Sequence, residues 1–231
     1  MSGLLRSMSR DLMISEAELL YLVPAYQISK ICRVFARNRF IVAVPRQAKS
    51  AATLIALGAD EIHMGPLGQL GPIDPQLGGL PALGVSQALR TIASVAEQHP
   101  GSADMFARYL QRALTVEQIG YCDRISESAV QYAVRLLSTK PQLASKAASI
   151  AKELVHEYKD HGFVIDIEEA RMHLGADWIK DGTAEVGAAE RIYSLLETVN
   201  LFLDVGQSKR IFVMGSVTHV SAVRVVKSRS R

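Results

Sequence analysis

The stretch that decides the fold is residues 40–64, which read FIVAVPRQAKSAATLIALGADEIHM. Residues 40–44 are continuously apolar and β-rich, as expected of a strand that is covered on both faces. Ser50 then opens a helix of small residues over 51–57, and residues 60–64 predict a second strand. Because strand, helix and strand follow one another within about 25 residues, the pattern indicates a tight parallel unit. We therefore expect an α/β protein.

Helices extend this unit on either side. Upstream, apolar residues recur at helical spacing over 16–38, with Pro24 as a point of interruption. Downstream, residues 65–84 hold six of the 16 glycines and four of the eight prolines, which predicts a shaped loop. The chain then becomes helix-rich: helical patterns occupy 85–97, 104–114, 116–121, 127–137, 144–158, 167–174 and 188–203, and a strand pattern occupies 210–214.

The chain divides into three predicted parts. Residues 1–139 form the α/β core, residues 140–216 form a helical C-terminal subdomain, and residues 217–231 form a basic tail. From residue 205 to residue 231 there are six basic residues and no acidic ones, whereas the whole chain has a net charge of +3. This end lacks a recognisable nucleic-acid-binding motif. We therefore expect a solvated, frayed tail and no nucleic-acid partner.

Composition disfavours several classes of protein. Hydrophobic residues make up 48% of the 231-residue chain, aromatic residues make up 6%, and the mean hydropathy is +0.13. A core of mostly Ala, Leu, Ile and Val favours packed helices over a small sheet and disfavours a β-sandwich. No window approaches the roughly 18–20 apolar residues that span a bilayer. Residues 1–11 lack the features of a signal peptide, so we expect a cytoplasmic protein without a membrane span.

The metal-ligating residue types do not predict a metal site. Cys32 and Cys122 lie far apart without a CxxC pair, so we expect reduced, buried thiols. One helical stretch carries ligand-type residues at spacings of three and four, but it lacks an HExxH motif and has lysine neighbours, which favours a solvated face. Its members are Glu153, His156, Glu157, Asp160 and His161. We expect no metal and no cofactor.

Ser50 is the position with the clearest chemical meaning. It lies where a parallel strand passes into a helix, and α/β folds build their sites at the carboxyl ends of such strands. The helix N-terminus behind the hydroxyl favours developing negative charge, so this location suits the nucleophile of an acyl transfer. Serine is also a favoured helix N-cap, and an ordinary cap remains the alternative interpretation.

The residues around and after Ser50 carry a resemblance to a known family. Lys49-Ser50-Ala51-Ala52 leads into residues 65–76, GPLGQLGPIDPQ, and this two-part motif closely resembles the serine dehydrogenase proteinase family. That family shares the fold of Clp proteases and crotonases and is similar to signal peptide peptidase A. The resemblance implies a Clp/crotonase-like fold with parallel βα units and a helix-rich second half. It also implies peptide hydrolysis, with Ser50 as the nucleophile.

The chain departs from the family pattern at the oxyanion hole. Family members usually carry a His-Ser-Pro-Gly-Gly-like turn before the first long helix, whereas residues 16–20, EAELL, stand in its place here. We therefore expect residues 1–139 to be an N-terminally shortened or diverged core. Loss of the turn predicts weakened catalysis, because one oxyanion donor contributes roughly 3–4 kcal/mol of transition-state stabilisation.

A serine nucleophile also needs a base, and no residue stands out for that role. Lys49 is adjacent in sequence, but consecutive side chains usually diverge, which favours a lysine that faces solvent or substrate. His63 lies on the second strand, where it faces either the site or a covering helix. By resemblance to the Clp proteases, Asp123 falls in the segment that supplies the orienting aspartate of a triad. A pairing of Asp123 with Arg124, or a helix cap, is the alternative.

These residues lead to one functional hypothesis and two alternatives. The chain is predicted to be a serine peptidase that hydrolyses peptides or proteins through an acyl-Ser50 intermediate, and to act as a homo-oligomer. The first alternative is a non-catalytic member of the fold that acts in oligomer assembly, which the missing glycine turn favours. The second is a crotonase-like acyl-thioester binder in which Ser50 does no covalent chemistry.

Overall fold

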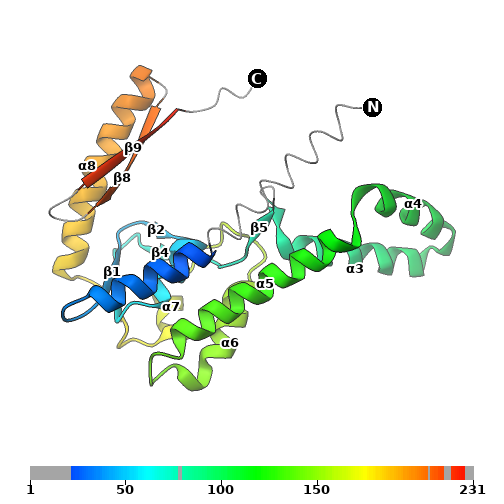
Figure 1. Ribbon diagram of the computed structural model, residues 1–231, viewed down its shortest axis with the longest axis horizontal. Coiled ribbons are helices and arrows are strands. Elements are labelled where there is room, and N and C mark those ends of the chain that lie inside the picture. Colours follow the sequence, from blue (N-terminus) through cyan, green and yellow to red (C-terminus); the bar gives the residue numbers. More distant parts are fainter. Residues whose placement is uncertain (1–21, 78–79, 208, 216–219, 227–231) are drawn as a thin grey trace.

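The computed structural model describes residues 22–77, 80–207, 209–215 and 220–226. Helices predominate, and the central strands are short and parallel (Figure 1). This architecture confirms the predicted fold class, an α/β protein with parallel βα units and a helix-rich second half. Within the described ranges, no helix combines the length and the apolarity that crossing a bilayer requires.

A three-stranded parallel sheet forms the centre of the body. Its strands are β1 (Ile41–Val44), β3 (Glu61–Met64) and β7 (Ile179–Lys180), in the order β1-β3-β7. Helix α2 (Ala51–Leu57) connects β1 to β3, so the unit predicted from residues 40–64 is confirmed. Because β7 comes from the second half of the chain, both halves build the sheet.

A second pair of parallel strands follows the carboxyl end of β1. It consists of β2 (Gln47–Ala48) and β4 (Gln69–Leu70), and an isolated antiparallel bridge joins Leu70 to Ile165. The loop predicted over 65–84 therefore contains β4. It also contains the short antiparallel pair β5 (Gln76–Leu77) and β6 (Leu80–Pro81).

A helix over residues 22–35 lies against the end of α2. It continues through Pro24, so the interruption considered there does not occur. The Ser29 hydroxyl donates to the Ile55 carbonyl at 2.9 Å. A Cβ added to Gly58 would lie 1.8 Å from Ser29 Oγ, so only glycine permits this close approach.

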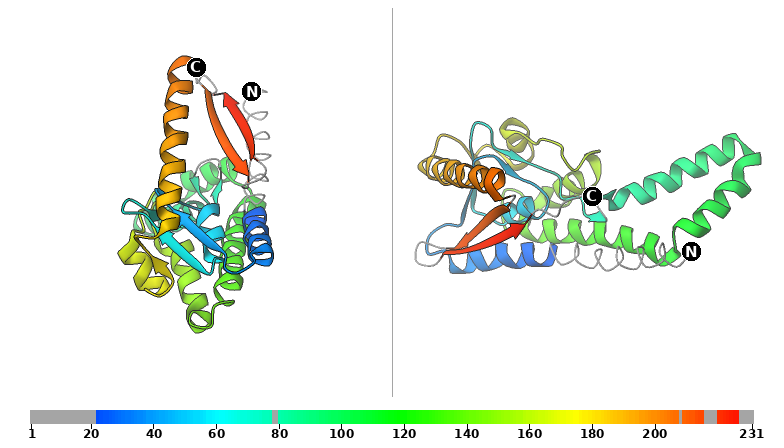
Figure 2. Two further views of the ribbon diagram at one scale, coloured as in Figure 1. Left: turned by 90° about the vertical axis from the view of Figure 1, so that its left-hand side faces the viewer. Right: turned by 90° about the horizontal axis from the view of Figure 1, so that it is seen from above.

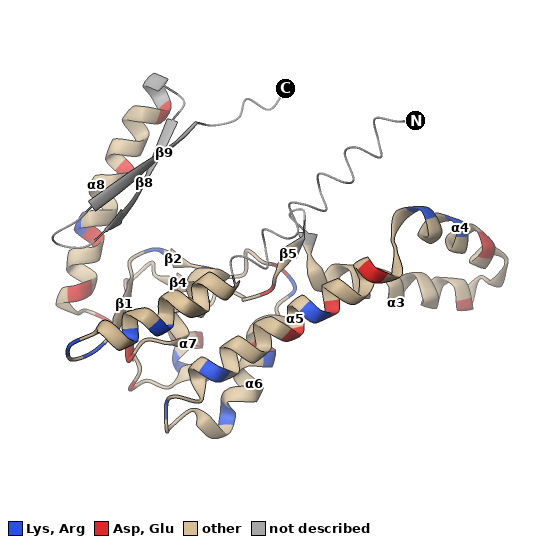
Figure 3. Cartoon of the chain, viewed as in Figure 1, with Lys and Arg blue, Asp and Glu red and all other residues tan. Residues whose placement is uncertain are grey.

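The helices after the loop form an arm that projects from the body (Figures 1 and 2). The arm contains α3 (Ala82–Gln98), a 3₁₀ turn (Pro100–Ser102), α4 (Ala103–Ala113) and the first part of α5 (Val116–Leu137). No residue of α4 is buried. Acidic and basic residues are interspersed along α5 (Figure 3).

Helix α5 is one continuous helix, so the prediction of two helices over 116–121 and 127–137 is wrong. The five residues between those patterns include neither glycine nor proline, and Cys122, Ile125 and Ser126 are buried on the same face as later residues of the helix. Tertiary packing therefore keeps residues 122–126 helical, although this stretch looks polar in sequence.

The remaining helices pack around the same core. Helix α6 (Ala147–Lys152) follows a 3₁₀ turn (Ala144–Lys146), continues into a π-helical turn (Glu153–Glu157) and packs on α5. Helix α7 (Ile167–Leu174) precedes β7, and its bounds match the predicted helix. One continuous cluster of buried residues extends from Leu54 and Ile62 to Ala151 and Trp178. The proposed subdomain boundary near residue 140 stays a prediction.

The last elements are α8 (Ala184–Gln207) and a hairpin of β8 (Lys209–Gly215) and β9 (Val220–Val226). Strand β8 contains the predicted strand over 210–214. The expectation of a frayed tail is wrong for residues 220–226, which pair with β8 along its whole length. Valine-rich sequence favours extended backbone, and the adjacent strand supplies hydrogen-bond partners.

Both cysteines are free thiols. Cys122 is buried, and burial raises the pKa of its thiol, with a further contribution from the charge of Asp123. Cys32 is half-buried, so the expectation of a buried thiol is confirmed for Cys122 alone.

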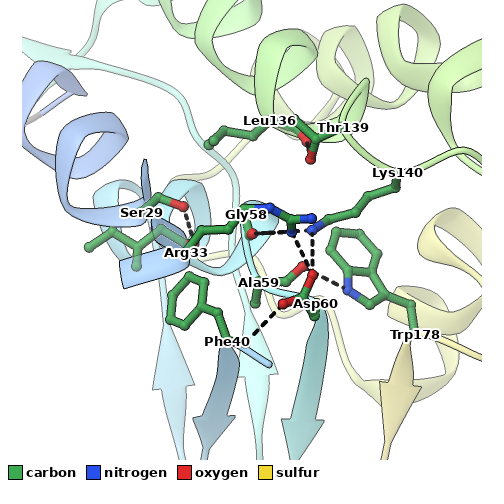
Figure 4. Close-up of polar contacts among 11 residues, drawn as sticks. Ser29, Arg33, Phe40, Gly58, Ala59, Asp60, Leu136, Thr139, Lys140 and Trp178 are labelled. Carbon is green, nitrogen blue, oxygen red and sulfur yellow. Dashed lines mark hydrogen bonds and ion pairs between the residues drawn. The ribbon is translucent and has the colours of Figure 1, made fainter. Parts of the chain in front are cut away.

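A cluster of charged side chains closes the amino-terminal end of the sheet (Figure 4). Asp60, directly before β3, accepts a hydrogen bond from the Phe40 amide at 2.9 Å and pairs with Arg33 at 2.6 Å and Lys140 at 3.6 Å. Burial alone would raise the pKa of Asp60, but the amide and the two cations together hold it below its ordinary value. The cluster therefore ties helix 22–35 and the end of α5 to the start of β3.

Lys140 is the buried cation of this cluster. It is 4% exposed, donates to the Gly58 carbonyl at 3.2 Å and lies 5.7 Å from the centre of the Trp178 ring. Burial, together with the charge of Arg33, lowers the pKa of Lys140 from 10.5 to about 8, although Asp60 acts in the opposite direction.

The depressed pKa predicts that the protein becomes more stable as the pH rises from about 8 towards 10.5. In that window the unfolded chain still binds the Lys140 proton that the folded chain has released, so the free energy of unfolding increases with pH, by about 3 kcal/mol. Lys140→Met should remove this rise, while Asp60 keeps Arg33 and the Phe40 amide. Urea unfolding across this pH range measures the effect. Lys152→Met, at an exposed lysine of α6, should keep the rise, and equal pH profiles for both variants would contradict the assignment.

Candidate active site

Ser50 occupies a sharp turn between β2 and α2. Its backbone angles are φ 53° and ψ −117°, and within the described chain it is the only non-glycine residue with a positive φ. Such a conformation is costly for a residue with a Cβ, and strained residues of this kind cluster at functional sites. A strand-to-helix turn of this shape is also how nucleophilic serines are presented in α/β hydrolases.

The Ser50 side chain does not cap α2. No hydrogen bond joins its hydroxyl to an amide of the first helical turn. Elsewhere in the chain, Thr115 caps α5 by accepting from the Gln118 amide, and Asp166 caps α7 by accepting from two amides. The interpretation of Ser50 as an ordinary N-cap is therefore wrong, and its hydroxyl is not used to start the helix.

Hydrogen bonds to the neighbouring segment hold this turn. The Ser50 amide donates to the Pro72 carbonyl at 3.0 Å, and the Gly71 amide donates to the Ala48 carbonyl at 3.1 Å. The buried Thr53 hydroxyl lies between the two segments, 2.5 Å from the Ala48 carbonyl and 2.9 Å from the Gly71 carbonyl. The segment after β4 is thus bound directly beside Ser50.

Two residues further along that segment, the buried Asp74 pairs with the half-buried His161. Asp74 Oδ1 lies 2.5 Å from His161 Nδ1, and its other oxygen accepts from Gln76 at 2.8 Å. Asp74 is 4% exposed, and burial raises the pKa of its carboxyl, while the hydrogen bond and the charge of His161 act against that rise. The pair fixes the His161 ring by Nδ1, which leaves Nε2 for another partner.

Lys49 joins the turn to the loop that carries His161. Its ammonium donates to the Gly162 carbonyl at 2.5 Å, one residue after His161. Its stem lies against Gly71, where an added Cβ would come within 2.6 Å of Lys49 Cγ. Lys49 and Ser50 therefore contact the two segments that hold His161 and Asp74.

The other sequence-based candidates lie in different surroundings. His63 is buried on β3, with Nδ1 2.9 Å from the Thr183 hydroxyl and Nε2 2.9 Å from Glu61, so both ring nitrogens are engaged. Asp123 is exposed on α5 and accepts from the Ser86 hydroxyl at 2.7 Å. Neither contact links the residue to Ser50.

Sequence reasoning missed the pair of Asp74 and His161. Asp74 was part of the GPIDPQ motif, and His161 was considered only as a member of the helical cluster with Glu153. The order Ser, Asp, His along the chain is the order of the α/β hydrolases, and that order was the available signal. In the described part of the chain, no group of three or more His, Cys, Asp or Glu residues is arranged to hold a metal ion.

The glycine-rich loop has few amides left for an oxyanion. The Gly65 amide donates to the Val44 carbonyl, the Gly68 amide to the Gly65 carbonyl, and the Gly71 amide to the Ala48 carbonyl. The Ala51 amide follows Ser50 at the first helical position, where no intrahelical acceptor exists. Residues 16–20, which stand in the place of the family's glycine turn, lie outside the described residues.

Fold and turn together define the class of protein, an α/β protein with a serine at a strand-to-helix turn. The chain belongs to the serine dehydrogenase (SDH) proteinase family, because the family model described as "ClpP-like SDH-type serine proteinase" matches residues 6–210. This confirms the resemblance found in the sequence and points to serine peptidases as the class of activity.

Two relatives of the chain have names that state no activity. It is 30% identical over 173 residues to the uncharacterized protein MJ0137 of Methanocaldococcus jannaschii, which is 75% of this chain and 52% of the relative. It is 47% identical over 47 residues to the uncharacterized protein MJ1495 of the same organism, which is 20% of this chain and 16% of the relative. The chain thus spans about half the length of the first relative and a smaller part of the second. No solved structure matches it.

The conformation of Ser50 predicts an unusual response to substitution. Ser50→Ala should change the free energy of unfolding little, because no cap is lost. Ser50→Gly should be about 1 kcal/mol more stable than Ser50→Ala, because glycine adopts a positive φ without strain. Asp166→Ala is the matched control and should cost about 1 kcal/mol, because that side chain does cap a helix. Urea denaturation measures all three; a loss at Ser50→Ala equal to that at Asp166→Ala would restore the N-cap interpretation.

Proposed function

We propose that the protein is a serine peptidase that cleaves peptide bonds through an acyl-Ser50 intermediate. The observation that carries this proposal is the strained, uncapped turn at Ser50. Ser50 has a positive φ, which is energetically unfavourable for a residue with a Cβ, and its hydroxyl makes no capping hydrogen bond that would offset this strain. Presentation of a nucleophile accounts for why the strained conformation is kept.

His161 is the proposed general base, with Asp74 as the residue that positions it. In the acylation step, His161 Nε2 accepts the Ser50 hydroxyl proton while Oγ attacks the carbonyl carbon of the scissile bond. The protonated ring then donates that proton to the leaving amine, and a water molecule repeats the sequence to release the acid. Asp74 accepts a hydrogen bond from Nδ1–H throughout, which holds the tautomer that leaves Nε2 as the acceptor.

The Ala51 amide is the proposed first oxyanion donor. The amide of the residue after the nucleophile plays this role in strand-to-helix turns of this type. Donors in a preorganised site act on the charge that develops on the carbonyl oxygen.

Substrates are proposed to be peptides or proteins. We retain the cytoplasm as the proposed location and a homo-oligomer as the proposed oligomeric state.

Labelling with a fluorophosphonate probe tests the nucleophile. The wild type should react, and Ser50→Ala should abolish the reaction while leaving the thermal midpoint within a few degrees. A wild type that does not react would remove the peptidase proposal. Binding of coenzyme A by such an unreactive protein would favour the acyl-thioester alternative, and its absence would favour a role in assembly.

Matched substitutions test the base and its partner. His161→Gln and Asp74→Asn should each lower the labelling rate by roughly 10²–10⁴-fold, because an activated serine depends on an oriented base. Asp123→Ala is the control and should label at the wild-type rate. If Asp123→Ala slowed labelling as much as Asp74→Asn, the orienting role would belong to Asp123, as the sequence first indicated.

A further inference from the structure

The ammonium of Lys49 is a cation beside the proposed nucleophile. Its hydrogen bond goes to the Gly162 carbonyl, and this contact is exposed to solvent. A carbonyl can accept a hydrogen bond but does not neutralise a charge. The positive charge of Lys49 therefore remains at the surface between Ser50 and the His161 loop.

Several other half-buried or buried cations among the described residues form ion pairs. Arg33 and Lys140 pair with Asp60, and Arg46 pairs with Glu190. Among the ion pairs of the described residues, none involves Lys49. Lys49 shares this lack of an ion pair with the half-buried Lys180 of β7, but Lys49 is the one that precedes Ser50 in the chain.

The carboxylates of the neighbouring segments are committed elsewhere. Asp74 is held by His161 and Gln76. Asp160, in the loop that Lys49 contacts, accepts from the Gly162 amide at 2.8 Å. Neither carboxylate forms an ion pair with Lys49, so its charge is open to a carboxylate of the substrate.

From this arrangement we infer that Lys49 selects substrates with a carboxylate close to the scissile bond. The inference rests on the proposed function, since it assigns the substrate class of the same site. A lysine stem spans about two residues of extended peptide, at about 3.4 Å per residue. The anionic group therefore lies within about two residues of the bond that Ser50 attacks, either as an acidic side chain or as the terminal carboxylate of a short leaving segment.

The contact also explains why Lys49 is not the base. Its stem lies against Gly71 and its ammonium donates to the Gly162 carbonyl, so the ammonium is engaged with the loop that carries His161. An exposed ammonium is a compact charge on a flexible stem, and it can exchange a carbonyl for a carboxylate with little rearrangement. Such exposed charge pairs are modest in strength and weaken with salt.

Hydrolysis of matched quenched-fluorescence peptides tests the inference. One set places Glu or Gln at each of the two positions on either side of the cleaved bond, and a second set carries a free or an amidated C-terminus. The wild type should cleave the best anionic peptide several-fold to about tenfold more efficiently than its neutral match, mainly through a lower KM. The preference should shrink at high ionic strength. The first set reports an acidic side chain, and the second reports a terminal carboxylate.

Variants of Lys49 separate substrate recognition from a purely structural role. Lys49→Gln should make the KM values for the anionic and the neutral peptide equal, and Lys49→Arg should keep the preference for the anionic peptide. Lys152→Gln is the matched control and should behave as the wild type. Loss of kcat for both peptides in Lys49→Gln would show that Lys49 only holds the His161 loop in place, and would overturn the inference.

The outcome is distinguishable from failure of the proposed function. If Ser50→Ala cleaves the peptides as fast as the wild type, the peptidase proposal fails. If Ser50→Ala is inactive while the wild type shows no preference between Glu and Gln or between free and amidated ends, the peptidase stands and the role of Lys49 is refuted.

Discussion

The positive φ of Ser50 is the constraint on which the rest of the site depends. A residue with a Cβ stays in that conformation only where its surroundings hold it, and here the Pro72 carbonyl and the Thr53 hydroxyl do so. The same hydrogen bonds bring the segment after β4 to the turn. Asp74, and through it His161, are therefore placed by the interactions that strain the serine. The conformation of Ser50 and the position of the proposed base therefore depend on the same hydrogen bonds.

The two ends of the sheet have different tasks. At the amino end, the charges of Asp60, Arg33 and Lys140 tie helix 22–35 and the end of α5 to β3 and close the core. At the carboxyl end, the turn at Ser50 and the pair of Asp74 and His161 lie in loops that cross between the halves of the chain. This division is usual for α/β proteins, whose ligands bind beyond the carboxyl ends of the strands. The stabilising ion pairs at the amino end of the sheet thus permit the strained conformation of Ser50 at the carboxyl end.

Sequence-based prediction succeeded where local pattern and tertiary structure agree. The apolar run at 41–44, the small-residue helix at 51–57 and the helix at 167–174 each carry their own signals, and each forms as expected. Prediction failed where tertiary contacts override the local sequence pattern. Helix α5 continues because packing buries Cys122 and Ile125, and residues 220–226 form a strand because β8 offers a partner. Neither partner is visible in a local window of sequence.

The sequence by itself determined the βα unit, the family and the serine, because a strand-to-helix junction and a glycine-rich loop leave local marks. Only the tertiary structure decided the surroundings of that serine. Asp74 and His161 lie 87 positions apart in the sequence, and their pairing depends on the bridge between Leu70 and Ile165. Whether Ser50 caps its helix depends likewise on a backbone angle that distant carbonyl and hydroxyl groups impose. Long-range hydrogen bonds, which have no periodicity in sequence, turned a plausible nucleophile into a candidate active site.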